Sequence, residues 1–309
     1  MRVIFFGTSA FAVPSLERLV AGGHAVVLCV TQPDKPKGRG LNVEASPVKQ
    51  AALKLNVPLA QPERLKRESL GPVQADIGVV AAYGQLIRRD VLDLPAQGIL
   101  GVHPSLLPRH RGAAPVAWAL LNGDPLTGVT IFRLNERLDA GPMLRVQAYP
   151  VHETDTTETL TERLALFGAD QLILTLSDIA EGVAKDAPQD DSAATLAPKL
   201  TKEQSRIQWK KDAPTIARQV RALWPWPGAT TELGDTRLKI ASAEALPVNA
   251  AGAPGTVLQA AAAGLDVAAG SGVVRIRELQ PAGKRCMSAA AFLAGHPVAP
   301  GTCLGGSHA

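Results

Sequence analysis

The sequence predicts an α/β protein: a Rossmann-like, mainly parallel sheet in an N-terminal domain, followed by a small OB-like β-barrel domain. In the first half, short apolar runs alternate with helix-like stretches, which is typical of βαβ units. After position 213, short strand-like runs are separated by turn residues, which favours a barrel. A chain of 309 residues is long for one core, so we expect two domains, 1–200 and 206–309.

The N-terminal elements follow one another in βαβ order. The expected strands are 2–6, 25–30, 77–82 and 99–102, and the expected helices are 11–20, 47–55 and 115–121. Right-handed crossovers make such strands parallel, and ligands bind beyond their carboxyl ends. Thr8, Tyr83 and His103 end or directly follow these strands, so we expect their chemistry at one edge of the sheet.

The C-terminal elements begin after a long amphipathic helix expected at 156–179. Residues 186–192 are polar and predict a loop, and the charged segment 200–212 predicts a linker. A helix carrying Ile216 and Val220 then stops at the Trp-Pro-Trp-Pro-Gly run of 224–228. The expected barrel strands are 237–240, 255–258, 265–268 and 272–276.

Composition excludes several classes of protein. Hydrophobic residues make up 46% and charged residues 19%, as in globular proteins. The three cysteines, Cys29, Cys286 and Cys303, form no CxxC pair, so we expect reduced thiols and no metal site. No targeting or membrane-spanning segment is visible, so we expect a cytoplasmic protein without a membrane partner.

Charge and motif content narrow the ligand class. From Arg206 onward the chain has 11 Lys and Arg against 6 Asp and Glu, while the remainder has 21 against 22. This basic C-terminal third suits a polyanion, although a net charge of +5 is a weak indication of nucleic acid. The first βα turn lacks GxGxxG, and no P-loop or GxSxG elbow is present.

Two polar residues are candidates for catalysis. His103 follows an apolar strand and is flanked by Pro104, so it is held on a stiff backbone and can shuttle a proton near neutral pH. Asp139 lies in a glycine-containing turn and could raise the pKa of a neighbouring histidine. Taken alone, each has a structural alternative: a hydrogen-bonding histidine, and an aspartate that stabilises its own turn.

The segment 32–47 is rich in proline, glycine and basic residues and predicts a long exposed loop. Such loops are often functional, although composition alone favours a solvated surface loop.

Together these segments resemble the methionyl-tRNA formyltransferase family over nearly the whole chain. The matching segments are 6–14 (FGTSAFAVP), 31–40 (TQPDKPKGRG), 82–85 (AYGQ), 103–115 (HPSLLPRHRGAAP), 128–130 (GVT), 138–141 (LDAG) and 280–284 (QPAGK). The segment 103–115 is the most specific of them. Each match alone is moderate evidence, but their order along the chain makes the resemblance strong.

The resemblance implies transfer of the formyl group of 10-formyltetrahydrofolate to the amino group of methionyl initiator tRNA, for translation initiation. It implies that His103 is the proton shuttle and Asp139 the carboxylate that orients it, in a monomer that needs no metal. The implied tetrahydrofolate contacts are Ser105, Leu106, Leu107, Pro108, Tyr83, Gly84 and Gln85, and the implied tRNA contacts are Arg39, Lys35 and Lys37.

One position departs from the family, because Gly101 stands where the family has an asparagine that donates to the developing oxyanion. Loss of one such donor typically slows a reaction about a hundredfold to a thousandfold. Water or His103 could fill the gap, the enzyme could be slow, or the residue could differ from a parent sequence. If the protein transfers no formyl group, recovery of transfer in Gly101→Asn would place the defect at this one side chain.

Three functions therefore remain open. The first is the tRNA formyltransferase, which the long inserted loop and the basic C-terminal domain favour. The second is another folate-dependent enzyme with this core, either a nucleotide-sugar formyltransferase or a 10-formyltetrahydrofolate hydrolase. The third is an RNA-binding protein that has lost activity at Gly101.

Overall fold

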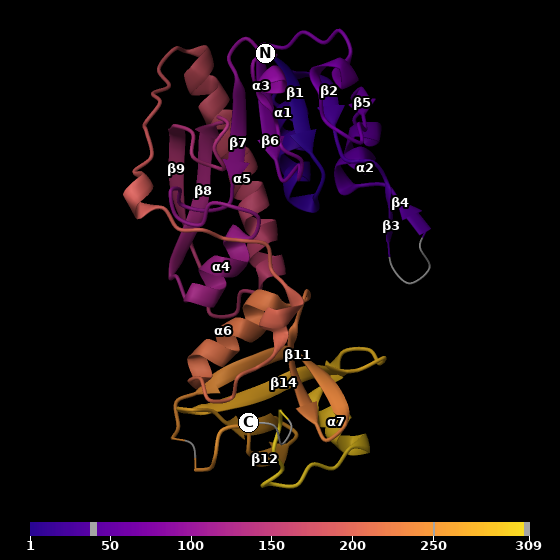
Figure 1. Cartoon of the computed structure of the whole chain (residues 1–309), viewed down its shortest axis with the longest axis vertical. Coiled ribbons are helices and arrows are strands. Elements are labelled where there is room, and N and C mark those ends of the chain that lie inside the picture. The colour runs from indigo at the N-terminus through magenta and orange to yellow at the C-terminus, as the bar shows by residue number, and fades with distance from the viewer. Residues whose placement is uncertain (38–41, 250, 306–309) are drawn as a thin grey trace. The chain divides into compact units, whose positions relative to one another are not determined.

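The computed structural model describes residues 1–37, 42–249 and 251–305. The chain forms two compact units (Figure 1). Unit 1 contains Met1–Pro115, Leu126–Pro150 and Leu160–Pro198, and unit 2 contains Val116–Pro125, Val151–Thr159 and Lys199–Ala309. The two units are described separately.

Unit 1 is built on a seven-stranded sheet in the order β5-β2-β1-β6-β7-β8-β9 (Figure 1). Its strands are β1 (Arg2–Gly7), β2 (Ala25–Val30), β5 (Leu59–Ala60), β6 (Ile77–Ala81), β7 (Ile99–His103), β8 (Leu126–Arg133) and β9 (Met143–Pro150). The strands from β5 to β7 pair in parallel, whereas β8 and β9 pair antiparallel at the other edge. The predicted mainly parallel sheet is confirmed, and β5, β8 and β9 are strands that the sequence analysis did not predict.

The helices that pack with this sheet are α1 (Val13–Ala21), α2 (Pro47–Lys54), α3 (Arg89–Leu92) and α5 (Thr157–Ala180), and α4 (Pro115–Asn122) connects β7 to β8. Local chemistry explains where α2 begins: the Ser46 hydroxyl accepts from the Lys49 amide, and Pro47 stands at the first helical position. On α5, a Cβ at Gly168 would lie 3.0 Å from Val102 and 3.3 Å from Val129. Because α5 covers this face of β7 and β8, the alternating Gly101 and His103 point to the opposite face.

The segment predicted as an exposed loop contains a small hairpin, so that prediction is wrong for part of it. Strand β3 (Lys35–Lys37) pairs antiparallel with β4 (Asn42–Glu44), outside the seven-stranded sheet (Figure 1). The base of the hairpin is fixed because Asp34 accepts from Lys49 at the start of α2 and from the Gln61 amide at 2.8 Å. The described parts of the segment are therefore paired and anchored.

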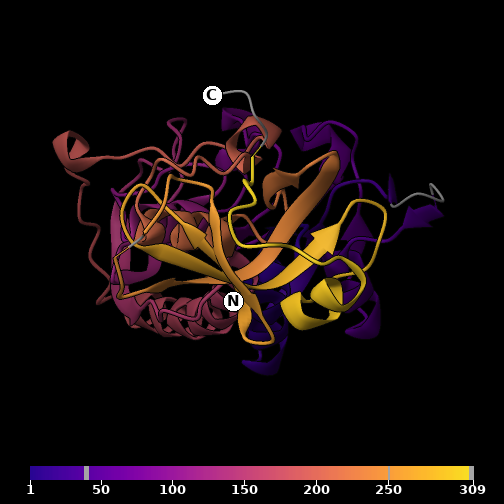
Figure 2. The same ribbon diagram turned by 90° about the horizontal axis from the view of Figure 1, so that it is seen from below.

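Unit 2 is built on a six-stranded antiparallel sheet in the order β10-β11-β14-β13-β12, with β15 paired to β14. Its elements are α6 (Ala213–Leu223), β10 (Ala229–Leu233), β11 (Thr236–Leu246), β12 (Val257–Ala261), β13 (Gly264–Ala268), β14 (Val273–Pro281), β15 (Met287–Ser288) and α7 (Ala289–Gly295). Residues 301–305, the closing segment, bridge its two edges: the Leu304 amide donates to Gly255 and the Gly305 amide to Glu232, both at 2.8 Å. The sheet thus curves into a barrel (Figure 2).

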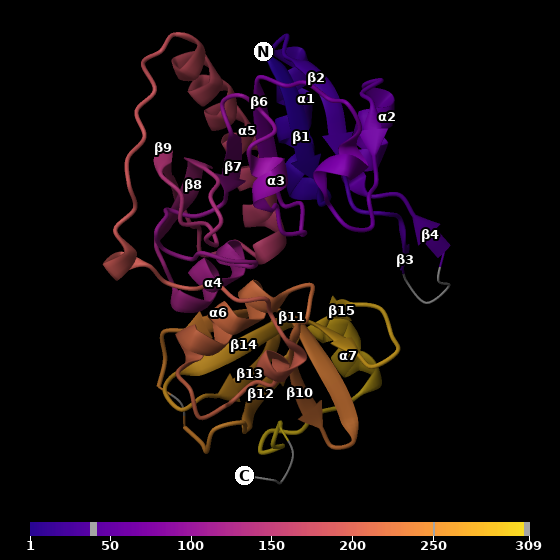
Figure 3. The same ribbon diagram turned by 45° about the horizontal axis from the view of Figure 1, so that its top comes forward.

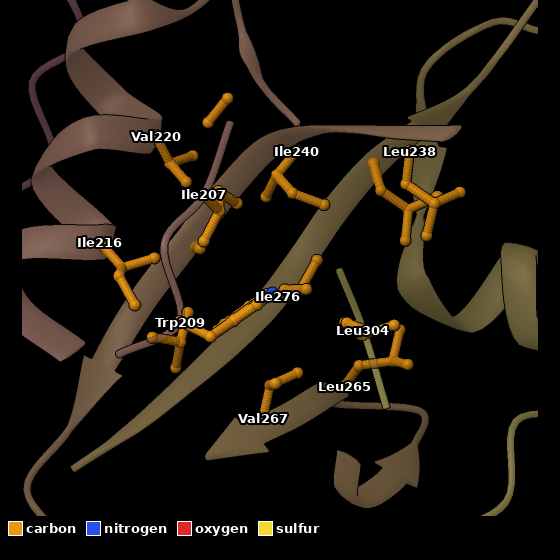
Figure 4. Packing of buried hydrophobic residues seen from close by; sticks show 14 of the residues in the cluster. Ile207, Trp209, Ile216, Val220, Leu238, Ile240, Leu265, Val267, Ile276 and Leu304 are labelled. Carbon is orange, nitrogen blue, oxygen red and sulfur yellow. The ribbon is translucent and has the colours of Figure 1, made fainter. Parts of the chain in front are cut away.

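The core of unit 2 shows that the prediction of a linker at residues 200–212 is wrong. Ile207 and Trp209 are buried among side chains of α6, β11, β13 and β14 (Figure 4), and the Trp209 indole donates to Thr231 at 3.1 Å. Helix α6 lies across β11 and β14 (Figure 3) and supplies Ile216 and Val220 to the same core. The segment 200–212 is therefore part of the folded unit, because its two large apolar residues outweigh its charged composition.

Candidate active site

The carboxyl ends of β1, β6 and β7 lie side by side, as the sequence predicted. The Thr8 hydroxyl, after β1, donates to the Tyr83 carbonyl after β6 at 2.8 Å. His103 is the last residue of β7, which pairs with β6. This edge of the sheet therefore gathers the polar residues that follow the three strands.

His103 is 7% exposed and makes one short hydrogen bond, from Nε2 to the His110 carbonyl oxygen at 2.9 Å. Because a carbonyl only accepts, Nε2 carries the proton and Nδ1 is the basic nitrogen of the neutral ring. Nδ1 lies 3.8 Å from Asp139 Oδ2, too far for a direct hydrogen bond but close enough for charge attraction. The structure thus brings together the two predicted catalytic residues.

Burial lowers the pKa of His103 below its usual value of 6.5, because the low-dielectric surroundings disfavour the charged ring. The Asp139 carboxylate and the bond to the His110 carbonyl oppose this shift, and the charge on His110 adds to it. The ring is therefore neutral near pH 7, and Nδ1 can take up a proton.

Asp139 is held in a tight turn. Its φ of +47° lies in the left-handed region, which is costly for a residue with a side chain. Its Oδ2 accepts from the Gly112 amide at 2.8 Å, so the carboxylate is oriented by the loop that follows His103. Two residues later, a Cβ at Gly141 would overlap the Arg133 carbonyl oxygen, so the turn requires glycine there.

The loop 105–108 is fixed mainly by the buried hydroxyl of Thr130 on β8. This hydroxyl donates to the Ser105 carbonyl at 2.7 Å and accepts from the Leu107 amide at 3.1 Å. The Ser105 hydroxyl is itself occupied, donating to the Arg109 carbonyl at 2.6 Å. Leu106 and Pro108 are half-buried, so they are the members of this loop whose side chains remain partly open to a ligand.

The predicted folate contacts of the segment 83–85 have structural partners. The Tyr83 ring is 2% exposed and packs in the apolar core of unit 1, edge-on to Phe6. Gln85 accepts from the Leu65 amide and donates to the Pro62 carbonyl. Gly84 has a φ of +82°, and a Cβ there would lie 2.5 Å from the Gln32 amide nitrogen. These residues shape the strand end through their packing and backbone.

Gly101 lies beside the aromatic ring of Phe132, its partner on β8. A Cβ at Gly101 would overlap Phe132 Cε1, and it would lie 2.7 Å from Cζ and 2.9 Å from Leu134 Cδ1. The same ring meets His103 edge-on, with 6.4 Å between centroids. Hence an asparagine side chain at position 101 does not fit unless Phe132 moves.

The three predicted tRNA contacts belong to the β3–β4 hairpin and its connection. Lys35 is exposed, and its ammonium donates to Gln32 at 2.7 Å. Lys37 ends β3, and Arg39 lies outside the described residues. The hairpin is separate from the His103–Asp139 pair in sequence and in pairing.

Sequence reasoning gave no site role to Gln189, to Phe132 or to the Thr130 hydroxyl. Each of these residues contacts the site from a segment distant in the sequence, so no local sequence pattern predicts the contact. Across the described ranges, no cluster of three or more His, Cys, Asp or Glu side chains could hold a metal ion. Nor does any helix in those ranges have the length and apolar character needed to cross a membrane.

Comparison with protein families finds two matches that together span most of the chain. Residues 1–176 match the family described as formyl transferase, and residues 199–297 match the formyl transferase C-terminal domain.

The chain is also similar in sequence to curated proteins named methionyl-tRNA formyltransferase. The chain is 48% identical to the methionyl-tRNA formyltransferase of Thiobacillus denitrificans, over 99% of this chain and 100% of that protein. It is 46% identical to that of Methylococcus capsulatus, over 97% and 98%. These matches confirm the resemblance inferred from the sequence motifs.

Solved structures share the fold at low identity. An N-formyltransferase from Helicobacter canadensis, in complex with folinic acid and dTDP-3-aminofucose, has a TM-score of 0.69 at 15% identity, covering 89% of this chain and 98% of that one. HypX from Aquifex aeolicus, in complex with tetrahydrofolic acid, has a TM-score of 0.63 at 18% identity, covering 95% and 47%. At these identities the likeness concerns the fold alone, and it agrees with the predicted α/β class.

Proposed function

Because this chain belongs to the formyl transferase family, we propose that it transfers the formyl group of 10-formyltetrahydrofolate to the amino group of methionyl initiator tRNA. The full-length similarity to proteins named methionyl-tRNA formyltransferase supports this acceptor. The observation that carries the chemistry is the buried His103 ring, whose Nδ1 faces the Asp139 carboxylate. The residue assignments below are part of the proposal.

The folate supplies the formyl group, and the residues of the chain move the proton. As the amine nitrogen bonds to the formyl carbon, His103 Nδ1 takes a proton from that nitrogen. Asp139 then stabilises the imidazolium through charge. The bond between the formyl carbon and the folate nitrogen breaks, and the proton passes from His103 to that nitrogen. His103 returns to its neutral form.

The loop 105–108, which Thr130 holds in place, fits the role of a folate-binding wall. Leu106 and Pro108 offer partly open apolar surface there, which suits a flat heteroaromatic group. Tyr83, Gly84 and Gln85 would act indirectly, by fixing the end of β6 beside this wall.

We assign catalysis to residues 1–200 and tRNA binding to residues 206–309, together with Lys35, Lys37 and Arg39 of the inserted segment. The net charge of +5 from Arg206 onward supports contacts to the tRNA backbone, where attraction to phosphate dominates. We further propose that the protein is a monomer acting in the cytoplasm, where charged initiator tRNA is used. Light scattering after size-exclusion chromatography would test the first statement, and cell fractionation the second.

Formyl transfer with purified components tests the proposal. Labelled 10-formyltetrahydrofolate is offered with methionyl initiator tRNA, with uncharged tRNA, with a nucleotide-linked amino sugar, and with no acceptor. We expect label only on the charged tRNA. Label on the sugar, or formate release without acceptor, would replace this function with one of the two related ones.

The variant His103→Ala tests the assigned chemistry. It should abolish transfer while folate binding, measured by fluorescence quenching, survives. Full activity in His103→Ala would remove His103 from the mechanism.

A further inference from the structure

Residues 187–197 form a strap across the loops that carry His103 and Asp139. At one end of the strap, Ala187 and Met143 exchange two backbone hydrogen bonds of 2.7 and 2.8 Å. At the other end, the Ala197 amide donates to Arg111 at 2.7 Å, and the Arg111 amide donates to Thr195 at 2.9 Å. The strap thus joins the chain after the Asp139 turn to the chain after His103.

Gln189, in the middle of the strap, uses the full hydrogen-bonding capacity of its side chain. Its Nε2 donates to the carbonyl oxygens of Asp139 at 2.8 Å and Gly141 at 2.7 Å. Its Oε1 accepts from Arg111 Nε at 3.0 Å and Nη2 at 2.7 Å. A primary amide has two donors and two acceptor sites, and all four are occupied here.

The partners of Gln189 lie on the Asp139 turn and next to Gly112, the residue whose amide orients the Asp139 carboxylate. On one side is the Asp139 turn, whose left-handed backbone must be held by its surroundings. On the other side is Arg111, a 7% exposed residue that Asp191 also holds, at 2.8 Å. Arg111 precedes Gly112, whose amide donates to the Asp139 carboxylate. Gln189 therefore braces both the turn that bears the carboxylate and the loop that orients it.

We propose that Gln189 is a positioning residue that sets the Asp139 carboxylate against His103 Nδ1, a role that rests on the function proposed above. Its side chain fixes the backbone of the turn, and it touches neither reacting group. Loss of this brace lets the carboxylate move relative to the ring. Misplacement of a catalytic group by about 1 Å can cost on the order of a hundredfold in rate.

Two variants separate the donor and acceptor halves of the amide. Gln189→Met keeps the length of the side chain and removes all four hydrogen bonds. Gln189→Glu keeps acceptors for Arg111 but loses both donors and sets a negative charge against two carbonyl oxygens. Both should lower kcat by about tenfold to a hundredfold, while KM for each substrate changes by less than about threefold.

Ser192→Ala is the matched control from the same strap. Ser192 is exposed, and among the described residues its hydroxyl bonds only to Asp190, so kcat should stay at the wild-type value. Thermal unfolding of each variant checks that the protein remains folded. An unchanged kcat in folded Gln189→Met and Gln189→Glu would overturn the proposal.

A double-mutant cycle with Asp139→Asn tests whether Gln189 acts through Asp139. If it does, adding Gln189→Met to Asp139→Asn causes no further loss of kcat, because the group being positioned is already neutralised. An equal loss in both backgrounds would mean that Gln189 acts independently, which would overturn the proposal.

A measurement that needs no activity separates this inference from the proposed function. In NMR spectra of protein labelled at histidine, the His103 ring resonance is the signal that is missing from the variant His103→Gln. The variants Gln189→Met and Asp139→Asn should both shift this resonance. Ser192→Ala should leave it in place. If the wild-type protein transfers no formyl group but the variants show these shifts of the His103 resonance, only the proposed function is refuted. If the wild-type protein is active but Gln189→Met leaves the resonance unmoved, only the role of Gln189 is refuted.

Discussion

His103 shows how one residue acquires its chemistry from its surroundings. Its sequence context, a histidine after an apolar strand, fits a structural residue as well as a catalytic one. In the structure, the hydrogen bond from Nε2 to the His110 carbonyl leaves Nδ1 facing Asp139, an arrangement that supports the proposed catalytic role. Burial then keeps that nitrogen unprotonated near neutral pH.

The lowered pKa of His103 predicts a pH dependence of both rate and stability. The acid side of the kcat/KM profile should have its midpoint below 6.5, because the ring loses its proton at lower pH than a free histidine. The free energy of unfolding should fall as pH drops below 6.5, since the unfolded ring binds a proton that the folded ring, beside Asp139 and His110, binds only at lower pH. Urea unfolding above and below that pH should show a smaller loss in His103→Gln. An equal loss in the two proteins would contradict this sign.

Gly101 and Phe132 are predicted to be coupled in stability. Gly101→Ala and Gly101→Asn should each cost about 1–3 kcal/mol, because the new Cβ overlaps the Phe132 ring in a packed interior. Phe132→Leu removes the atoms Cε1 and Cζ, so combining it with Gly101→Asn should recover about 1 kcal/mol or more relative to additivity. Denaturant unfolding of the four proteins measures this coupling. Strictly additive costs would show that the ring yields freely.

At the scale of elements, the candidate site lies at the carboxyl ends of the neighbouring strands β1, β6 and β7. The sequence predicted the ends of β1, β6 and β7 because their apolar runs stop at polar residues. It did not predict how β8 would fix the loop after β7. Thr130 performs that task from the neighbouring strand, through two backbone atoms of the loop.

Thr130→Val should destabilise the fold by about 1–3 kcal/mol, because the Ser105 carbonyl and the Leu107 amide would be left without their partner. The loosened loop should raise KM for 10-formyltetrahydrofolate more than it lowers kcat. Thr127→Val on the same strand is the control: among the described residues its buried hydroxyl has no partner, so the change should be neutral or stabilising. Equal effects of the two substitutions would remove the role given to Thr130.

The elements that sequence reasoning missed have identifiable causes. Strand β10 carries two threonines and a glutamate, so it lacks the apolar run that marked the others. Ile207 and Trp209 stand in a charged segment, where composition masked two buried positions. The segment of the β3–β4 hairpin contains Pro36, Gly38 and Gly40, and these residue types favour a loop in any prediction from local sequence.

For the whole molecule, the alternation of apolar runs was sufficient for the fold class, and the order of motifs for the family. The contacts that surround His103 and Asp139 could not be predicted in this way. Gln189 lies 50 residues from Asp139 and 78 from Arg111, and it stands in a polar stretch that reads only as a loop. Two of its four hydrogen bonds go to backbone carbonyls, which carry no sequence signal.

The closing segment of unit 2 has a consequence for biosynthesis. Its amides supply the last hydrogen bonds between the two edges of the barrel, at Gly255 and Glu232. Because a nascent chain emerges from the ribosome N-terminus first, all six barrel strands emerge before residues 301–305 do. During that interval the two edges of the nascent barrel lack these hydrogen bonds, and an unpaired strand edge can pair with another chain.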